Sequence, residues 1–296
     1  MAPEMGDSAD IPKVTRETIV SGLRRLGLSA GEGVMVHSSL SSFGRVVGGA
    51  PTVIRALMEV LTPEGTLLMP SFNHGKAFAA GGAGCFDPLT TPTTNGAIPQ
   101  AFWPMRGVWR SLHPTHAFAA WGKNARRYIE FHHRTLTCGP DSPLGLLGRE
   151  GGRGLLLGVD YRSNTFHHVV EMTTGAPCLG RRTSALPVRL PDGRMVEGRT
   201  WSWREKGCPI TDPTRYAGLM EQRGLQRHTT IGASRVICFR LKDCFDVVAE
   251  LLAEGVDGLP PCARCPIRPR RGEQTALSDW DDARQRLKPD SPAWGY

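Results

Sequence analysis

Apolar positions in the first part of the chain alternate between helical spacing and short continuous runs. Residues 16–27 carry apolar side chains at helical spacing and end in glycine, a typical helix stop. Residues 34–40 predict a strand that runs into a polar turn, and residues 51–61, which begin with proline, predict a helix. Residues 66–70 predict a second strand, which completes a segment of the length of a βαβ unit. The apolar run 154–159 predicts a third buried strand.

The rest of the chain predicts a mixture of loops, hairpins and helices. Residues 73–115 are rich in glycine and proline, and we expect a structured loop at 86–99 and a loop leading into a strand at 110–122. Pro-Asp-Gly within 186–198 predicts a hairpin, and 226–241 holds two further strand candidates. Helical patterns cover the segments 123–133, 213–224 and 242–255.

These elements favour the α/β class, with a mixed central sheet, flanking helices and an added β-rich lobe. The 296 residues provide enough chain for a sizeable core. We expect one domain over residues 12–260, with the lobe at roughly 178–232 and a peripheral tail at 261–296. The chain shows no internal repeat.

Composition narrows the protein class. Hydrophobic residues make up 40% and charged residues 22%, as in globular proteins. No stretch reaches the roughly 20 apolar residues of a membrane span. The acidic, polar start does not resemble a signal peptide, so we expect no membrane association and a cytoplasmic location. The eight cysteines are then expected to be reduced, and Cys262 and Cys265 form a lone CxxC pair that lacks two further metal ligands.

The net charge of +8 suggests an anionic partner. Part of the excess lies in the basic run 264–271, for which a solvated tail and a nucleic-acid patch are the two interpretations. The chain has no zinc finger, RNP-type motif or basic–aromatic interleaving, so we do not expect nucleic-acid binding.

A pair of adjacent histidines follows the third predicted strand. On a helix, His168 and Glu171 are i,i+3 neighbours and His167 and Glu171 are i,i+4 neighbours, so spacing alone leaves both pairs open. Ser163 or Asn164 can cap this helix. A carboxylate beside a histidine sets its tautomer and raises its basicity, which suits a general base. The competing interpretation is a polar first turn of a helix with a structural histidine–carboxylate pair.

Two loops offer binding groups. The segment 37–49 follows a strand, precedes a helix and is rich in serine and glycine, so its N–H and hydroxyl groups suit phosphate or amide ligands. It is neither a Walker A motif nor GxGxxG, and an ordinary turn is the alternative. In the loop 110–116, Arg110 and Ser111 are candidates for anion or amide contacts. Metal ligation by His113 and His116 is an alternative without an evident ligand set, and a turn fixed by His113-Pro114 is the favoured interpretation.

Taken in order, several blocks of the chain resemble the aminoglycoside 3-N-acetyltransferase family. The similarity extends over roughly residues 12–260. The blocks that carry it are 34-VMVHSSLSSFGRVVGG-49, 65-GTLLMPSF-72, 86-FDPLTTPTTNGAIP-99, 110-RSLHPTHAFAAWGKNA-125, 141-DSPLGLLG-148, 155-LLLGVDYRSNTFHHVVE-171 and 232-GASRV-236.

The resemblance implies a CoA-dependent acyltransferase of the antibiotic N-acetyltransferase type, whose fold differs from the common N-acetyltransferase fold. It places the pantetheine and phosphates of acetyl-CoA against a set of residues in the HSSL turn and the loops around it. Those implied cofactor-binding residues are His37, Ser38, Ser39, Leu40, Val46, Val47, Arg110 and Ser111.

The family pattern Thr-x-x-His-x-x-Glu selects Thr165, His168 and Glu171 as the catalytic residues and leaves His167 as a neighbour. His168, oriented by Glu171, would deprotonate an amine that attacks the thioester directly in a ternary complex, and Thr165 would help to stabilise the oxyanion. No cysteine lies in a recognisable nucleophile context. We expect no metal, and a monomer or homodimer.

The acceptor is a primary amine in either of two interpretations. The resemblance implies the 3-amino group of a 2-deoxystreptamine aminoglycoside, a polycation that requires local acidic groups. Asp160, Glu205 and Asp212 are the candidates for that contact, although the segment 201–212 is mixed in charge. The alternative is a biosynthetic enzyme of the same family that acylates another amine of a secondary metabolite.

Three further classes compete with acyl transfer. A non-catalytic CoA- or nucleotide-binding protein would lose the histidine–glutamate pair, which this chain keeps. A basic nucleic-acid binder would depend on the C-terminal residues 264–296. A metal hydrolase would use His167, His168 and Glu171 as ligands, and a metal assay tests that hypothesis.

Overall fold

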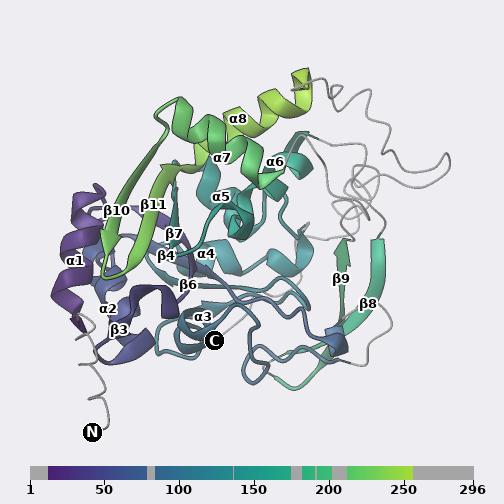
Figure 1. Cartoon of the computed structure of the whole chain (residues 1–296). Coiled ribbons are helices and arrows are strands. Elements are labelled where there is room, and N and C mark those ends of the chain that lie inside the picture. The colour runs from purple at the N-terminus through teal and green to yellow at the C-terminus, as the bar shows by residue number, and fades with distance from the viewer. Residues whose placement is uncertain are drawn as a thin grey trace, which may run out of the picture.

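The computed structural model describes residues 13–78, 84–135, 137–174, 182–190, 192–201 and 212–255 (Figure 1). These residues include a mixed sheet with the spatial order β10-β11-β7-β2-β4-β6-β5. The strands of this sheet are β2 (Gly33–Ser38), β4 (Thr66–Pro70), β5 (Trp109–Arg110), β6 (Phe118–Gly122), β7 (Arg153–Leu157), β10 (Gln226–Ile231) and β11 (Ser234–Arg240).

Helices cover both faces of the sheet (Figure 1). One face packs against α1 (Arg16–Arg25), α2 (Gly49–Leu61) and α3 (Ala97–Phe102). The other packs against α4 (Ala125–Ile129), α5 (Pro143–Arg149), α6 (Phe166–Thr174), α7 (Pro213–Gln222) and α8 (Leu241–Glu254). Short 3₁₀ turns lie at η1 (Ser41–Phe43), η2 (Lys76–Phe78), η3 (His132–Arg134) and η4 (Tyr161–Ser163).

The strands at the centre of the sheet are apolar on both faces. In β2, Val34 and Val36 pack against the α1 and α2 side, whereas Met35 packs against the α5 and α6 side. Successive side chains of a strand point to opposite faces, so a strand between two helix layers needs a continuous apolar run. Each such side chain stabilises the fold by about 1.5–3 kcal/mol through its burial. The apolar runs of the sequence thus correspond to the buried centre of the sheet.

Three of the central strands form the parallel part of the sheet. β2 pairs in parallel with β4 on one side and with β7 on the other. β6 and β11 flank these strands and run antiparallel to their neighbours. The predicted βαβ unit is therefore β2, α2 and β4, and the carboxyl ends of β7, β2 and β4 lie side by side at one edge.

Most predicted elements are confirmed, with shifts at their ends. Gly27 has φ +86 and follows α1 as the predicted helix stop. The second helix begins at Gly49, so the proline at position 51 is not its first residue as predicted. The helix predicted over 123–133 is wrong in length, because α4 ends at Ile129 and the chain continues into η3. The loop predicted at 86–99 contains the start of α3.

The added β structure is a hairpin of β8 (Arg182–Arg189) and β9 (Met195–Trp201). A parallel bridge between Phe86 and Val188 joins it to the loop after η2, and both side chains are buried. The lobe predicted for 178–232 is too wide, since β10 belongs to the central sheet. A short parallel pair, β1 (Lys13–Val14) and β3 (Arg45–Val46), lies apart from that sheet. The predicted tail, 261–296, lies outside the described residues.

Candidate active site

A cavity of about 400 Å³ lies at the carboxyl ends of the parallel strands. Open α/β sheets bind their ligands at this edge, because the loops that leave adjacent strands meet there. The segments after β2, β4 and β7 and the residue His116 ahead of β6 supply its walls. The lining residues are His37, Ser38, Pro70, Phe72, His74, Asn95, His116, Val159, Arg162, Ser163, Asn164, Thr165, His167 and His168.

The turn after β7 brings α6 to the cavity. Gly158 has φ +67, and a Cβ at this position would overlap the side chain of Ser42, so the turn requires glycine. Asn164 lies just before α6, and its Oδ1 accepts a hydrogen bond from Phe166 N–H at 3.2 Å. Of the two predicted cap residues, Asn164 therefore supplies this contact.

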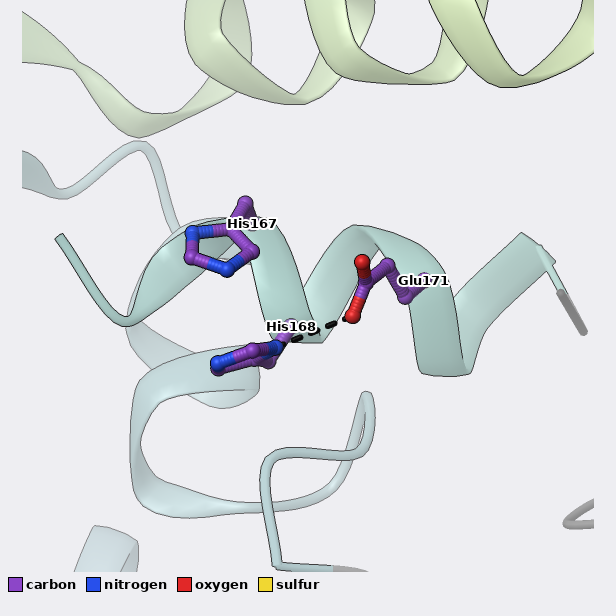
Figure 2. Close-up of side chains that lie close together, drawn as sticks. All are labelled: His167, His168 and Glu171. Carbon is purple, nitrogen blue, oxygen red and sulfur yellow. Dashed lines mark hydrogen bonds and ion pairs between the residues drawn. The ribbon is translucent and has the colours of Figure 1, made fainter. Parts of the chain in front are cut away.

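The first turn of α6 pairs His168 with Glu171 (Figure 2). His168 Nδ1 lies 2.9 Å from Glu171 Oε2, the Glu171 side chain is fully buried, and the His168 side chain is 26% exposed. A carboxylate accepts hydrogen bonds, so in neutral His168 the proton lies on Nδ1 and the lone pair on Nε2. His168 lines the cavity, so the pair has the arrangement of a base and its orienting carboxylate.

His167 has different partners. Its Nδ1–H donates to the carbonyl oxygen of Asn164 at 2.7 Å, and Tyr216 Oη lies 3.2 Å from the same nitrogen. Its ring lies beside that of His168, with 3.9 Å between the ring centroids (Figure 2). The structure thus decides what the spacing left open, because it pairs Glu171 with His168.

His167, His168 and Glu171 also lie close enough together to hold a metal ion. One donor atom from each of His167, His168 and Glu171 lies within 4.8 Å of the others. The short distance between His168 and Glu171 is consistent with a proton-transfer pair and also with two ligands of one metal ion. The metal-hydrolase hypothesis therefore requires a direct test.

His37 and Thr165 meet in the wall of the cavity. His37 Nε2 lies 2.9 Å from Thr165 Oγ1, and both residues are buried. Burial, with a smaller contribution from nearby His167, lowers the pKa of His37 to about 3. His37 is therefore neutral at physiological pH, and its contact orients the Thr165 hydroxyl group at the start of α6.

The remaining predicted residues of the HSSL segment spread along the loop beyond β2. Ser38 lines the cavity, and its buried Oγ has no hydrogen-bond partner among the described residues. Ser39 Oγ lies 3.1 Å from the hydroxyl of Ser41, outside the cavity lining. Leu40 packs partly buried on the α1 and α2 side. Of the predicted valines, Val46 lies in β3 and Val47 is 49% exposed.

Arg110 and Ser111 lie inside the protein rather than in the cavity lining. The Arg110 guanidinium stacks over the ring of Trp103 and donates to the carbonyl oxygen of Thr91 at 2.6 Å. Ser111 Oγ accepts from Phe118 N–H at 2.8 Å and lies 2.8 Å from a ring nitrogen of His132. Both contacts fix loops next to the cavity, and a cofactor contact for Arg110 or Ser111 stays a prediction.

The predicted acidic residues do not gather in the cavity. Asp160 accepts hydrogen bonds from the backbone N–H and the guanidinium of Arg162, and it lines a neighbouring hollow of about 450 Å³, which Arg162 also lines. Asp212 caps α7 by accepting from Thr214 N–H at 2.8 Å. Glu205 lies outside the described residues. Among the described residues of the cavity lining, the permanently charged side chain is that of Arg162.

Sequence reasoning gave no site role to two titratable residues of the cavity lining, His74 and His116. Their Nε2 atoms lie 3.1 Å apart, and the Phe72 ring packs against both imidazoles. Burial lowers the pKa of His74 and holds that of His116 well below its usual range. The interpretation of His116 as part of an ordinary turn was incomplete. The signal lay in its position, just before a strand that pairs with β4.

Comparison with known proteins agrees with this geometry. Residues 35–253 match the family model described as aminoglycoside 3-N-acetyltransferase. The chain belongs to this family. The predicted family and fold class are thereby confirmed, and so is the class of enzyme, an acyltransferase.

Relatives in this family cover different shares of the chain. An aminoglycoside N(3')-acetyltransferase-like protein, YokD of Bacillus subtilis, is 37% identical over 183 residues, which are 56% of this chain and 67% of the relative. Aminoglycoside N(3)-acetyltransferase VII of Streptomyces paromomycinus is 35% identical over 260 residues, which are 79% and 89%. The crystal structure of aminoglycoside acetyltransferase AAC(3)-Xa superposes with a TM-score of 0.72 at 30% identity, covering 83% of this chain and 94% of that one.

The helices of the structure also bear on membrane association. Among the described residues, no helix combines the length and the apolar character that a bilayer span requires.

Proposed function

We propose that this chain is a CoA-dependent N-acetyltransferase that moves an acetyl group from acetyl-CoA to a primary amine. The observation that carries the proposal is the His168–Glu171 pair, whose histidine lines a cavity at the ends of three parallel strands. The amine favoured by the family is the 3-amino group of a 2-deoxystreptamine aminoglycoside. The reaction takes place by direct attack in a ternary complex.

His168 acts as the general base. An alkyl amine has a pKa near that of lysine, about 10, so it is mostly protonated at neutral pH and cannot attack a thioester. Once the amine is unprotonated, His168 Nε2 takes a further proton from its nitrogen as that nitrogen attacks the carbonyl carbon. Glu171 is fully buried, and its negative charge stabilises the imidazolium that forms.

Thr165 stabilises the developing oxyanion. When neutral His37 donates its Nε2–H to Thr165 Oγ1, the Thr165 hydroxyl proton is left for the carbonyl oxygen of the thioester. His37 therefore acts through Thr165 rather than on acetyl-CoA itself. His168 then returns its proton to the sulfur as the carbon–sulfur bond breaks.

The cavity fits the pantetheine end of acetyl-CoA. Ser38 supports this fit, because its buried hydroxyl lines the cavity and has no partner among the described residues. A pantetheine amide would supply the missing hydrogen bond. Beyond Ser38, the exposed side of the loop through Ser39, Leu40, Val46 and Val47 offers a path for the rest of the molecule.

The charges around the cavity also favour a different acceptor, an amine that is less cationic than an aminoglycoside. An aminoglycoside is a polycation, whereas Arg162 contributes a positive charge to the described lining and holds Asp160 in an ion pair. Asp160 lines the neighbouring hollow rather than the cavity, and Asp212 is absent from the described lining of both. A biosynthetic N-acyltransferase acting on a less cationic amine is therefore the alternative, and Arg162 is the observation that favours it.

The test is release of the CoA thiol from acetyl-CoA with a panel of amines. The panel contains several 2-deoxystreptamine aminoglycosides together with uncharged and anionic amines. Turnover with the aminoglycosides supports the first acceptor, and turnover only with the others supports the alternative. Tight CoA binding without turnover on any amine would contradict N-acetyl transfer.

A further inference from the structure

The cavity lining contains a pair of histidines, His74 and His116, that the proposed mechanism does not use. The cavity spans the ends of β7, β2, β4 and β6, with His168 on the β7 side and His74 and His116 on the side of β4 and β6. His74 is exposed to solvent, whereas His116 is only 8% exposed. One member of the pair therefore reaches water and the other is fixed in the protein.

The pair continues into a hydrogen-bonded chain. His116 Nδ1 lies 2.8 Å from Thr115 Oγ1, and His116 Nε2 lies 3.1 Å from His74 Nε2. One consistent set of protons has His74 Nε2–H donating to His116 Nε2, and His116 Nδ1–H donating to Thr115 Oγ1. That set leaves a lone pair on His74 Nδ1. The arrangement of a base, an orienting group and an anchor matches that of known catalytic bases.

The proton balance of the reaction requires such a group. An ammonium ion and acetyl-CoA give the N-acetylated amine, the CoA thiol and one proton. The amine nitrogen therefore loses two protons, and the sulfur takes only one. His168 can carry the proton that passes from nitrogen to sulfur, but the other proton must leave the cavity before the nitrogen attacks.

We propose that His74 is a second proton acceptor, which takes the first proton from the bound ammonium ion at Nδ1 and passes it to water. His116 is a positioning residue that holds the Nε2 side of His74 through a contact anchored by Thr115. This inference rests on the proposed N-acetyl transfer. It allows the enzyme to use the ammonium form, which is the main form of an alkyl amine at pH 7.

The charges around His74 permit this role. His116 is kept neutral by burial, and so is His37, so neither adds a positive charge that would oppose proton uptake. The proton leaves readily, because partial burial lowers the pKa of His74. Among the described residues, the ionisable groups that line the cavity or adjoin His116 also include Arg162, His167, His168, His113 and His132.

The test compares His74→Ala with the unmodified enzyme from pH 7 to pH 9.5, using one alkyl amine that the enzyme acetylates. We expect kcat of the variant to fall at least about tenfold at pH 7. The ratio of the two kcat values should approach one as the pH nears the pKa of the amine, since the acceptor then arrives unprotonated. Added imidazole should restore activity to the variant at pH 7.

Matched variants separate this role from a structural one. His116→Asn should give a smaller loss with the same pH trend, and His228→Ala, on the exposed face of β10, should change nothing. His74→Gln serves as the second variant if His74→Ala fails to fold. A loss that is constant across pH and insensitive to imidazole would overturn the inference while leaving acetyl transfer intact. An unmodified enzyme that is inert with every amine would overturn both.

Discussion

Replacing Glu171 with glutamine tests the orientation and charge of the proposed base in one step. The substitution keeps the size of the side chain and removes its charge, 2.9 Å from His168 Nδ1. Unit charges about 4 Å apart attract by about 4 kcal/mol at an effective dielectric constant of about 20. The His168 side chain is 26% exposed, so water screens part of this attraction.

We therefore expect the substitution to reduce the stabilisation of the imidazolium by about 2–3 kcal/mol, which corresponds to a roughly 30- to 150-fold fall in kcat. The assay is thiol release from acetyl-CoA at saturating amine, with circular dichroism melting as the check on folding. Glu150→Gln is the matched control, because Glu150 bonds Arg127 and Tyr128 outside the cavity and should leave kcat unchanged. A Glu171→Gln enzyme that folds normally and keeps kcat within twofold would refute the assignment.

Three other predictions follow from the same residues. Burial lowers the pKa of His37 and His132 to about 3, so below pH 6.5 the unfolded chain binds more protons than the folded one. The free energy of unfolding should therefore fall by about 1.4 kcal/mol for each histidine per pH unit of acidification. A melting temperature that stays flat from pH 7 to 5 would contradict this. Ser38→Ala should raise the Kd for CoA several-fold by calorimetry, whereas Ser21→Ala, on the exposed side of α1, should not. Dialysis against a chelator should leave acetyl transfer unchanged, and lost activity that zinc restores would favour the metal alternative.

The central fold could be predicted because its signals are local. Buried parallel strands require continuous apolar runs. The sequence of α1 also marks both of its ends, with the Thr15 cap before it and the glycine at position 27 after it. The prediction failed where tertiary contacts decide. The two-residue strands β1 and β3 exist only as partners of each other, and no local pattern specifies them.

One missed element did carry a local signal. α5 has Ser142 as its cap, with Oγ accepting from Gly145 N–H at 3.1 Å, and proline at its first position. Its seven residues and two glycines hid the helical pattern. A search for caps as well as for periodicity would have found it.

The candidate site was predictable only in part, for a physical reason. His168 and Glu171 are three residues apart on one helix, so their spacing in the sequence was enough to make them candidates for a catalytic pair. His74 and His116 are 42 residues apart and meet only because β4 pairs with β6. Arg110 was predicted at a ligand from its charge and from the family resemblance, although aromatic rings and carbonyl groups can equally enclose a guanidinium inside the protein.

The most direct test of the account measures two properties of His168→Ala beside the unmodified enzyme. One is thiol release from acetyl-CoA in the presence and absence of the accepted amine, and the other is the Kd for CoA. The account predicts amine-dependent release by the unmodified enzyme, a loss of at least about 100-fold in the variant, and the same Kd for both. A variant that folds and keeps normal turnover would contradict the claim that His168 is the base of this acetyltransferase.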